Sequence, residues 1–422
     1  MSEESPFFNS PGSPPALPRK GLRRPGLLLT LLILGVQAGL GSAAFMSPGG
    51  GIIGWSLIPK AQCALCQAPK SVPTRTGAPL TFAGYAALLT QRLTLDQELG
   101  QMMVGQFAGQ GVTPEAIEML DTESISGVVL YASNIGSASQ IRAMNAQLQQ
   151  VASIPPLLAV DQEGGTVNRL LDLVGPLPGA GDLTDPQMAK ARGEQDANWL
   201  HEFGFNFNLA PVVDVGTSNP QLVDRTFGST PDRVISMASA YLDGLQAGGQ
   251  VTGCLKHFPG LGDTTTDPHI GLPVLNRSLP ELEQIDMQPY RVMLKTEHVR
   301  AIMVSHEMIP AVDAQLPTSL SPAVINGLLR KGLGYNGVVM TDSLSMDAIS
   351  ARWSTPDASL LAIEAGADVV SGLIGPQVIQ QTKDTLEEAV ASGKLTRQRI
   401  DASVQRILLL KLEMGLIPMP RS

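Results

Sequence analysis

The stretch KHFPGLGDTTTDPHIGLP, residues 256–273, gathers titratable side chains on a segment whose Gly and Pro content argues against a helix. His257 and His269, two of the five histidines of the chain, lie in it together with Lys256 and Asp267. Gly and Pro favour turns, so the sequence predicts a loop beyond residue 258. This density of titratable groups on a loop indicates a chemical site that the rest of the chain must position.

Further polar side chains stand where short β-branched runs of the sequence end. They are Asp161 after PPLLAV, Asp214 after APVV, Lys256 and His257 after VTGCL, His306 after IMVS, and Asp342 after VVMT. In a (β/α)₈ barrel the carboxyl ends of the strands form one face, where the connecting loops build the active site. A doubly wound sheet gathers ligand groups only near its switch point. Contributions from five strands therefore favour a closed barrel.

The region from about Leu80 onward alternates between short apolar runs and longer segments with helical spacing, such as 187–202 and 231–246. An eighth strand is expected within residues 99–107, besides seven visible runs. The seven are SGVVLYAS, PPLLAVD, FNLAPVVD, VTGCLKH, RAIMVSH, NGVVMTD and ADVVSG. Strands buried on both faces and separated by helices predict a parallel sheet. We therefore expect an α/β fold, a single TIM-type (β/α)₈ barrel over residues 80–422.

The composition limits the classes of function. A chain of 422 residues with 43% hydrophobic residues is long enough for one large α/β barrel. Its formal net charge of -9 gives no general basic surface for phosphate backbones, so we expect no nucleic-acid partner. Cys63 and Cys66 form a CxxC pair without further ligands nearby. We therefore predict no metal site, and a disulfide or free thiols remain alternatives for this pair.

The N-terminal segments differ from the rest of the chain. Residues 1–24 are polar and end in a basic cluster, and residues 25–45 then run without a charge. That length can span a bilayer, and the basic flank predicts a cytoplasmic N-terminus with the remainder exported. Small residues at 42–44 suit signal peptidase, so an anchor and a cleaved signal are both open. We expect residues 46–79 to be a Gly/Pro-rich linker, and the barrel to be anchored outside the cytoplasm or secreted.

Residues 93–418 resemble the glycoside hydrolase family 3 β-N-acetylhexosaminidases, which include bacterial enzymes that recycle or trim peptidoglycan. The motifs stand in the family's order: DQEGGTVNRL at 161–170, NPQLVDRTFG at 219–228, KHFPGLGDTTTDPH at 256–269, VSHEMIPAVD at 304–313 and LGYNGVVMTDSLSM at 333–346. The combination of KHFPGxGD with DxH is specific to the branch that cleaves N-acetylglucosamine. The resemblance does not extend to the N-terminal segments.

The resemblance implies that Asp342 is the nucleophile, a carboxylate that attacks the anomeric carbon and forms a covalent glycosyl-enzyme with retention of configuration. It implies that His269 is the acid/base and that Asp267 orients it, in place of the second carboxylate of ordinary retaining glycosidases. An imidazole has an unperturbed pKa near ~6.5, which suits proton transfer near neutrality.

The resemblance also implies a set of side chains that hold the sugar's hydroxyl groups. They are Asp161, Arg169, Arg225, Lys256 and His257. Charge-assisted hydrogen bonds of this kind discriminate against a sugar that lacks the matching hydroxyl. A plain ion pair with the neighbouring Asp224 is the alternative for Arg225.

The chain departs from the family pattern at four positions. Leu261 stands where KHFPGHGD has His, Thr166 where DQEGGRV has Arg, Pro268 where Ser is common, and Ser343 where a second Asp is usual. None of these changes removes an assigned catalytic group. Leu261 and Thr166 each delete a polar group that could reach the sugar, and Pro268 restricts the backbone beside the acid/base.

We predict a retaining exo-β-N-acetylhexosaminidase that releases terminal β-linked N-acetylglucosamine from cell-wall muropeptides or chitin fragments. The mechanism requires no metal and no organic cofactor. We expect a monomer whose partners are its carbohydrate substrate and, through the N-terminal segment, the membrane.

Three alternatives to this activity are open. A β-glucosidase of the same family would not need the DPH loop. A phosphorylase is compatible with a His acid/base, which does not repel an incoming phosphate. Asp342 and His269 argue against a third alternative, a non-catalytic wall-binding module.

Overall fold

The computed structural model describes residue 65 and residues 80–267 and 269–420. The predictions for the segments 1–24, 25–45 and 46–79, which hold Cys63 and Cys66, and for Pro268 concern positions outside these described residues. No helix within the described part of the chain is both long and apolar enough to cross a membrane.

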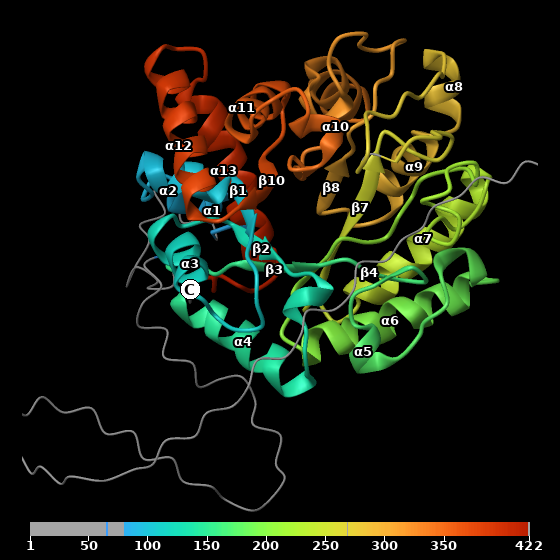
Figure 1. Ribbon diagram of the computed structural model, residues 1–422, viewed down its shortest axis with the longest axis horizontal. Coiled ribbons are helices and arrows are strands. Elements are labelled where there is room, and N and C mark those ends of the chain that lie inside the picture. The colour runs from blue at the N-terminus through green and yellow to red at the C-terminus, as the bar shows by residue number, and fades with distance from the viewer. Residues whose placement is uncertain (1–64, 66–79, 268, 421–422) are drawn as a thin grey trace, which may run out of the picture. The chain divides into compact units, whose positions relative to one another are not determined.

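Eight parallel strands close into a barrel, in the spatial order β1-β10-β9-β8-β7-β6-β3-β2 (Figure 1). The strands are β1 (Met103–Gln106), β2 (Gly127–Val129), β3 (Leu157–Val160), β6 (Phe207–Asn208), β7 (Thr252–Phe258), β8 (Ala301–Val304), β9 (Val338–Ser343) and β10 (Val369–Ile374). Each coincides with one of the predicted runs, although β7, β9 and β10 extend one or two residues beyond theirs, and this agreement confirms the α/β barrel. A hairpin of β4 (Gln162–Gly164) and β5 (Val167–Asn168) follows β3 and was not predicted.

Helices separate the strands and surround the barrel (Figure 1). They are α1 (Phe82–Thr90), α2 (Leu95–Gln101), α3 (Pro114–Ile117), α4 (Ala138–Val151), α5 (Leu171–Val174), α6 (Pro186–Glu202), α7 (Pro231–Gln246), α8 (Leu279–Gln284), α9 (Gln288–Thr296), α10 (Asp347–Ser350), α11 (Thr355–Ala365), α12 (Pro376–Ala391) and α13 (Arg397–Glu413). Short 3₁₀ and π segments are η1 (Glu118–Thr122), η2 (Ala132–Asn134), η3 (Ala180–Asp182), η4 (Thr318–Leu320) and η5 (Ala323–Gly332). The predicted helical segments 187–202 and 231–246 correspond to α6 and α7.

The start of α6 follows from its local sequence. Asp185 accepts hydrogen bonds from the backbone N–H groups of Gln187 and Met188 at 2.9 and 3.0 Å, and Pro186 occupies the first helical position. Both features stabilise a helix N-terminus, because the first N–H groups have no partner within the helix. The adjacent helix α7 packs against β7, so this pair of helices supports the strand that ends in the motif Lys256-His257.

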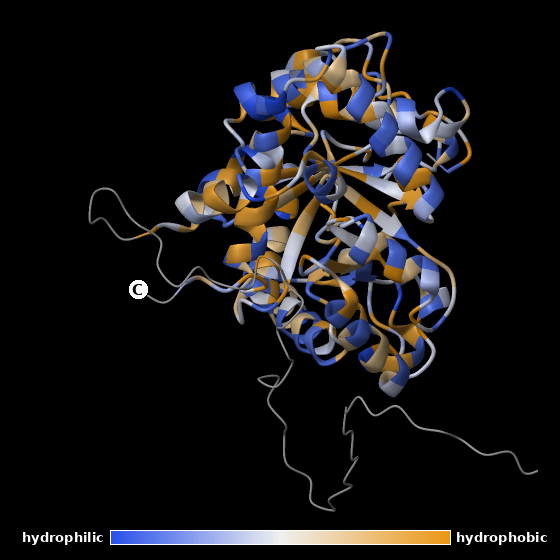
Figure 2. Ribbon diagram, turned by 90° about the vertical axis from the view of Figure 1, so that its left-hand side faces the viewer, coloured by the Kyte–Doolittle hydropathy of each residue, from blue (hydrophilic) through white to orange (hydrophobic). Residues whose placement is uncertain are grey.

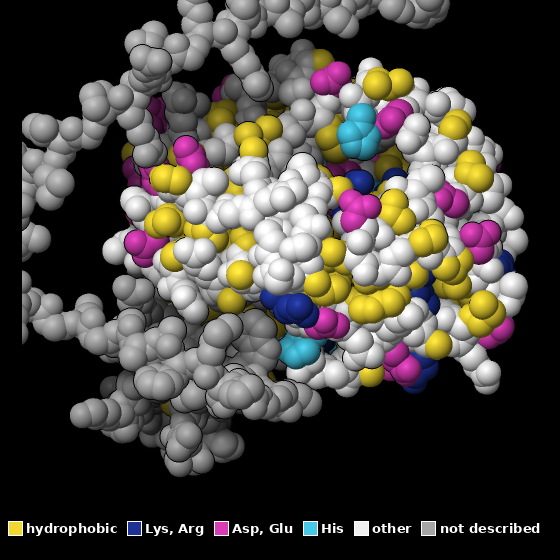
Figure 3. Space-filling model, turned by 60° about the horizontal axis from the view of Figure 1, so that its bottom comes forward, with side chains coloured by type: hydrophobic (Ala, Val, Ile, Leu, Met, Phe, Trp, Pro, Cys, Tyr) yellow, Lys and Arg dark blue, Asp and Glu magenta, His cyan; other side chains and the backbone are white. Residues whose placement is uncertain are grey.

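The core combines the strands with the inner faces of the surrounding helices, such as Leu148 of α4 and Leu408 of α13. Every residue of β2, β3, β7 and β8 is buried, as expected for strands covered on both faces. Figure 2 shows the hydrophobic strands at the centre of the ribbon, with hydrophilic residues on the surrounding helices and loops. On the face drawn in Figure 3, Lys and Arg side chains are scattered among acidic and apolar ones.

Candidate active site

The carboxyl ends of the barrel strands surround a cavity of about 790 Å³. In the ring of eight strands, β3 and β9 are four places apart and therefore lie on opposite sides. Asp161 directly follows β3 and Asp342 lies near the end of β9, so the two carboxylates stand on opposite walls. All the residues to which the family resemblance assigns a role line this one cavity: Asp161, Arg169, Arg225, Lys256, His257, Asp267, His269 and Asp342. The strand-end residues Asp214 and His306 are buried and are not among the lining residues.

Four charged side chains on the β3 and β7 side bind one another, and we call them the charged clamp: Asp161, Glu163, Arg225 and Lys256. Lys256 Nζ lies 2.6 Å from Asp161 Oδ1 and 2.6 Å from Glu163 Oε1. Arg225 donates two hydrogen bonds to Glu163, of 2.7 and 2.9 Å. The side chain of Lys256 is only 2% exposed. Each buried cation thus has the carboxylate partner that burial requires.

Glu163 is the member of the clamp that sequence reasoning missed. Burial alone would raise the pKa of its carboxyl group, but Arg225 and Lys256 outweigh burial and lower this pKa to about 2. Burial alone would lower the pKa of Lys256, but Asp161 and Glu163 outweigh burial and raise it. Glu163 and Lys256 are therefore both charged at neutral pH. Glu163 is part of the DQEGG motif, so the sequence contained a signal for it. Its pairing with Arg225 depends on the hairpin of β4 and β5, which was not predicted.

The neighbouring Asp224 does not form the ion pair with Arg225 that the sequence left open. Asp224 instead accepts hydrogen bonds from the N–H and the hydroxyl of Thr166, at 2.6 and 2.9 Å. A Cβ atom at Gly165, whose φ is 55°, would lie 2.3 Å from Asp224 Oδ2, so glycine allows this approach. Thr166 lines the cavity with a short side chain whose hydroxyl is bound to the protein.

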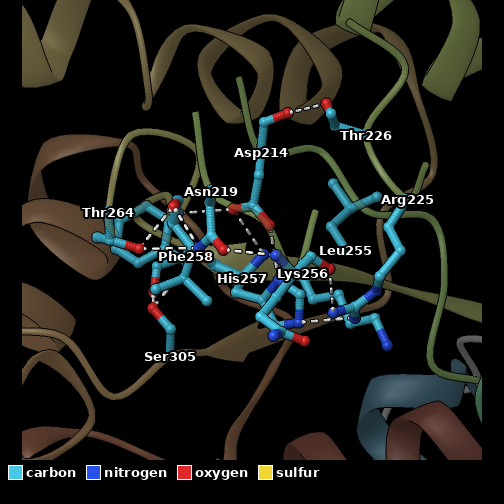
Figure 4. Close-up of polar contacts among 12 residues, drawn as sticks. Asp214, Asn219, Arg225, Thr226, Leu255, Lys256, His257, Phe258, Thr264 and Ser305 are labelled. Carbon is cyan, nitrogen blue, oxygen red and sulfur yellow. Dashed lines mark hydrogen bonds and ion pairs between the residues drawn. The ribbon is translucent and has the colours of Figure 1, made fainter. Parts of the chain in front are cut away.

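Asp214, in the segment after β6, orients the imidazole of His257 (Figure 4). A carboxylate can only accept, so Nδ1 of His257 donates to Asp214 Oδ2 at 2.7 Å, and Nε2 is left 3.5 Å from the Arg225 guanidinium. Asp214 Oδ1 also accepts the backbone N–H of Leu261 at 2.8 Å. The same carboxylate therefore positions His257 and the start of the loop that carries His269.

Asp342 accepts a hydrogen bond from the backbone N–H of Ser343 at 2.7 Å. Burial alone would raise the pKa of Asp342, but His306, His257, this N–H and Lys256 outweigh burial and lower it. Burial in turn lowers the pKa of His306. Asp342 is therefore ionised at neutral pH, as a carboxylate nucleophile must be.

Asp267 and His269, which we call the loop pair, form hydrogen bonds mainly with each other. Asp267 Oδ1 accepts the His269 Nδ1–H at 2.8 Å and the His269 backbone N–H at 2.9 Å. The side chain of His269 is 71% exposed and that of Asp267 is 18% exposed. Both residues line the cavity, which leaves Nε2 of His269 as the nitrogen available for proton exchange.

The start of this loop, residues 261–264, is held to the barrel by hydrogen bonds and by apolar contacts. Asn219 Nδ2 donates to the carbonyl of Leu261 at 3.2 Å and to the Thr264 hydroxyl at 2.9 Å. Leu261 is buried in a small apolar cluster with Val212 and Leu222. The residue that replaces the family's usual His therefore presents an apolar side chain to the cavity.

Tyr131 and Arg169 also line the cavity and carry groups that can form hydrogen bonds to a ligand. Tyr131, beyond β2, was not singled out from the sequence although it is another polar residue after a strand-like run. Burial, then the nearby Asp161 and Asp342, raise the pKa of its hydroxyl. The Nε of Arg169 has no hydrogen-bond partner among the described residues.

Within the described part of the chain, no group of three His, Cys, Asp or Glu side chains is arranged to hold a metal ion.

Comparisons with known proteins find relatives over most of the barrel. Residues 94–410 match the glycosyl hydrolase family 3 N terminal domain. Beta-hexosaminidase A of Pseudoalteromonas piscicida is 30% identical over 386 residues, which are 79% of this chain and 63% of that protein. A solved family 3 β-N-acetylglucosaminidase from Paenibacillus sp. str. FPU-7 is 34% identical with a TM-score of 0.74, over 78% of this chain and 64% of that one.

The solved beta-glucoside phosphorylase BglX is also similar in structure. It is 26% identical with a TM-score of 0.70, over 79% of this chain and 61% of that one. The present chain thus spans somewhat less than two thirds of the length of each of these three proteins.

Proposed function

Because the chain belongs to glycosyl hydrolase family 3, we propose that it is a retaining exo-β-N-acetylhexosaminidase that releases terminal β-linked N-acetylglucosamine. The observation that carries this proposal is the composition of one cavity: an ionised strand-end carboxylate, Asp342, shares it with the loop pair and with the charged clamp. A nucleophile and a separate proton donor are the two groups that a double displacement requires.

The charged clamp and its neighbours bind the terminal sugar. Asp161 and Lys256 present fixed acceptors and donors to the sugar hydroxyls, and His257 and Arg225 extend the same surface. Because these groups are already bound to one another, little reorganisation accompanies binding. A sugar that lacks a matching hydroxyl would leave buried polar groups unpaired.

In the first step Asp342 attacks the anomeric carbon while His269 donates a proton from Nε2 to the departing oxygen. The bond to the leaving sugar breaks and an ester bond to Asp342 forms, which gives the covalent glycosyl-enzyme. Asp267 holds His269 through Nδ1 at 2.8 Å, which directs Nε2 to the proton transfer.

In the second step the now neutral His269 takes a proton from water, and the resulting hydroxide attacks the same carbon. Asp342 leaves as a carboxylate, and two inversions give overall retention. His269 returns to its starting protonation state, so one residue serves as acid and then as base.

Phosphorolysis is a second candidate, because the group beside the incoming nucleophile is a histidine. A neutral or cationic imidazole does not repel phosphate as a second carboxylate would. The exposed position of His269 and the similarity to BglX favour testing phosphate as an alternative acceptor. A β-glucosidase activity is the remaining family alternative.

The natural substrate and the location belong to the same proposal. Muropeptides of the cell wall and chitin fragments both carry terminal β-linked N-acetylglucosamine. The uncharged run at 25–45 with its basic flank supports a barrel that is anchored or secreted outside the cytoplasm, where either glycan is accessible.

The test is hydrolysis of p-nitrophenyl β-N-acetylglucosaminide and of the matching glucoside, each with and without inorganic phosphate. We expect the N-acetylglucosaminide to be cleaved preferentially, with free N-acetylglucosamine as the product in both buffers. Preferential cleavage of the glucoside would reassign the chain to the glucosidases, and sugar 1-phosphate as the main product would make it a phosphorylase.

A further inference from the structure

The loop between β7 and α8, residues 259–278, carries the loop pair and is fastened at its two ends. Its start is held to the barrel as described above, and near its end backbone hydrogen bonds of 2.8 and 2.9 Å join it to Met308. Between these points, the described residues 265–267 and 269–272 form hydrogen bonds only among themselves. The position of His269 at the cavity therefore depends on how the two ends of the loop are held.

Arg277, near the end of this loop, joins its two ends. The guanidinium donates through Nη2 to Asp263, at the start of the loop, and through Nε to Asp286 Oδ2 at 3.0 Å. Asp286 lies between α8 and α9 and is buried. We call Asp263, Arg277 and Asp286 the arginine bridge. Because the side chain of Arg277 is only 17% exposed, solvent and salt screen these contacts less than those of a surface ion pair.

The buried carboxyl group of Asp286 is the fixed end of the bridge. A Cβ atom at Gly260, whose φ is 152°, would lie 2.7 Å from the Cβ of Asp286, so glycine lets the start of the loop pass this close. Burial raises the pKa of Asp286 to about 7, although Arg277 lowers it. A neutral carboxyl group can still accept the hydrogen bond from Nε, so Arg277 stays bound to Asp286 in either state.

We propose that Arg277 is a positioning residue for the acid/base: by joining the two ends of the loop, the arginine bridge holds His269 where its Nε2 reaches the departing oxygen. Among the described residues that line the cavity there is no member of the bridge, so the bridge acts through the loop and not on the sugar. This inference rests on the proposed function, because it assigns the bridge to the proton transfer of that reaction.

The length of the loop explains why the bridge matters. Asp263 and Arg277 are 14 positions apart in the sequence, with the loop pair between them. Releasing their contact increases the number of conformations that the intervening segment can adopt. A displacement of about 1 Å in a reacting group can lower a rate by about 10²-fold. Part of the catalysis by His269 should therefore depend on Arg277.

The other groups of the site do not depend on the bridge. Asp342 is held by the backbone N–H of Ser343 on β9, and the charged clamp is held by its own ion pairs. Release of the loop therefore leaves the nucleophile and the sugar-binding groups in place. The loss of rate should be largest for a substrate whose leaving group needs a proton.

The test compares Arg277→Gln with the wild type on chitobiose and on dinitrophenyl β-N-acetylglucosaminide, whose leaving group departs unaided. For chitobiose, kcat/KM should fall about tenfold, because part of the general acid catalysis is lost. For the dinitrophenyl glycoside, kcat/KM reports the first step alone and should stay within about twofold of the wild type. Its kcat should fall, because the second step needs His269 as a base.

Arg300→Gln is the matched control. The side chain of Arg300 is 18% exposed and its Nε lies 3.2 Å from Glu413, so it loses a similar ion pair. Arg300 directly precedes β8 and therefore lies at the opposite end of that strand from the cavity. Arg300→Gln should leave the ratio of the two kcat/KM values, chitobiose to dinitrophenyl glycoside, as in the wild type.

Asp263→Asn tests the same contact from its more exposed side. The side chain of Asp263 is 35% exposed, so the variant should fold even if Arg277→Gln does not. It should show the same selective loss on chitobiose. The double variant, Asp263→Asn with Arg277→Gln, should lose no more than the larger of the two single losses, because both changes break one contact.

An unchanged ratio of the two kcat/KM values in the folded bridge variants, or additive losses in the double variant, would overturn the inference. The proposed function would then still stand, because the wild type cleaves both substrates. Failure of the wild type to cleave either N-acetylglucosaminide would overturn the proposed function and the inference together.

Discussion

The charged clamp and the loop pair face the same cavity but are built in opposite ways. In the clamp, the side chains of Lys256 and Glu163 are 2% and 3% exposed, and each is bound to residues distant in the sequence. In the loop pair, His269 is 71% exposed and bound to a residue two positions away. The groups proposed to bind the sugar are therefore fixed beforehand, whereas the group proposed to exchange protons stays open to solvent. Breaking the clamp should affect folding and activity, and breaking the loop pair should affect activity alone.

The largest effect on activity is expected for His269→Ala. Loss of general acid catalysis should lower chitobiose hydrolysis by about 10² to 10⁴-fold, because the leaving sugar needs a proton. A dinitrophenyl glycoside has a leaving group that departs unaided, so it should still give a burst of dinitrophenol and then stall. Pre-steady-state and steady-state kinetics of both substrates measure this difference. Equal losses on both substrates would mean that His269 positions the sugar or supports the fold.

Glu163→Gln tests the clamp. Lys256 and Arg225 would keep a partner of similar shape but lose its negative charge, which should lower the free energy of unfolding by about 3 to 5 kcal/mol. Misplaced binding groups should also reduce kcat/KM by at least about 10²-fold. Denaturant unfolding and steady-state kinetics give both quantities. The matched control is Glu202→Gln, because the Glu202–Arg142 pair is half exposed and should contribute less than about 1 kcal/mol. Equal stability losses in the two variants would contradict the distinction between clamp and surface.

Acid should weaken the clamp through Glu163 in a defined window. The pKa of its carboxyl group is about 2 in the folded protein and 4.5 in an unperturbed chain. A lowered folded pKa contributes stability that is complete above pH 4.5 and is lost as the pH falls toward 2. The difference in unfolding free energy between wild type and Glu163→Gln should therefore shrink by about 3 kcal/mol across that window. Urea unfolding at a series of pH values measures this, and a constant difference would show that Glu163 is not ionised by its partners.

The smallest loss is expected for Asp267→Ala. This variant removes the carboxylate that orients His269 but leaves the imidazole, so chitobiose hydrolysis should fall by about tenfold. The unfolding free energy should stay within about 0.5 kcal/mol of the wild type, since the pair is on an exposed loop. A loss as large as that of His269→Ala would argue against a role limited to orienting the imidazole.

The sequence revealed the barrel better than it revealed the contacts inside the cavity. Strands such as β3 and β8 are short runs buried on both faces, so composition alone distinguishes them. Once a barrel was predicted, the polar residues at its strand ends could be assigned to one site. The ion pair between Arg225 and Glu163 could not be predicted, because Glu163 lies in a hairpin whose pairing no local sequence pattern indicated. The second role of Asp214, as an acceptor for Leu261, likewise depends on how the loop after β7 returns to the barrel.

The central claim is that Asp342 attacks the anomeric carbon. Incubation of the wild-type enzyme with a fluorinated slow substrate should trap the glycosyl-enzyme, because the fluorine slows both displacements whereas a good leaving group accelerates only the first. Peptide mass spectrometry should then find the sugar on Asp342, and Asp342→Asn should remain folded and unlabelled. A label on another carboxylate, such as Asp161 or Asp347, would contradict the assignment of the nucleophile and with it the orientation of the sugar in the cavity.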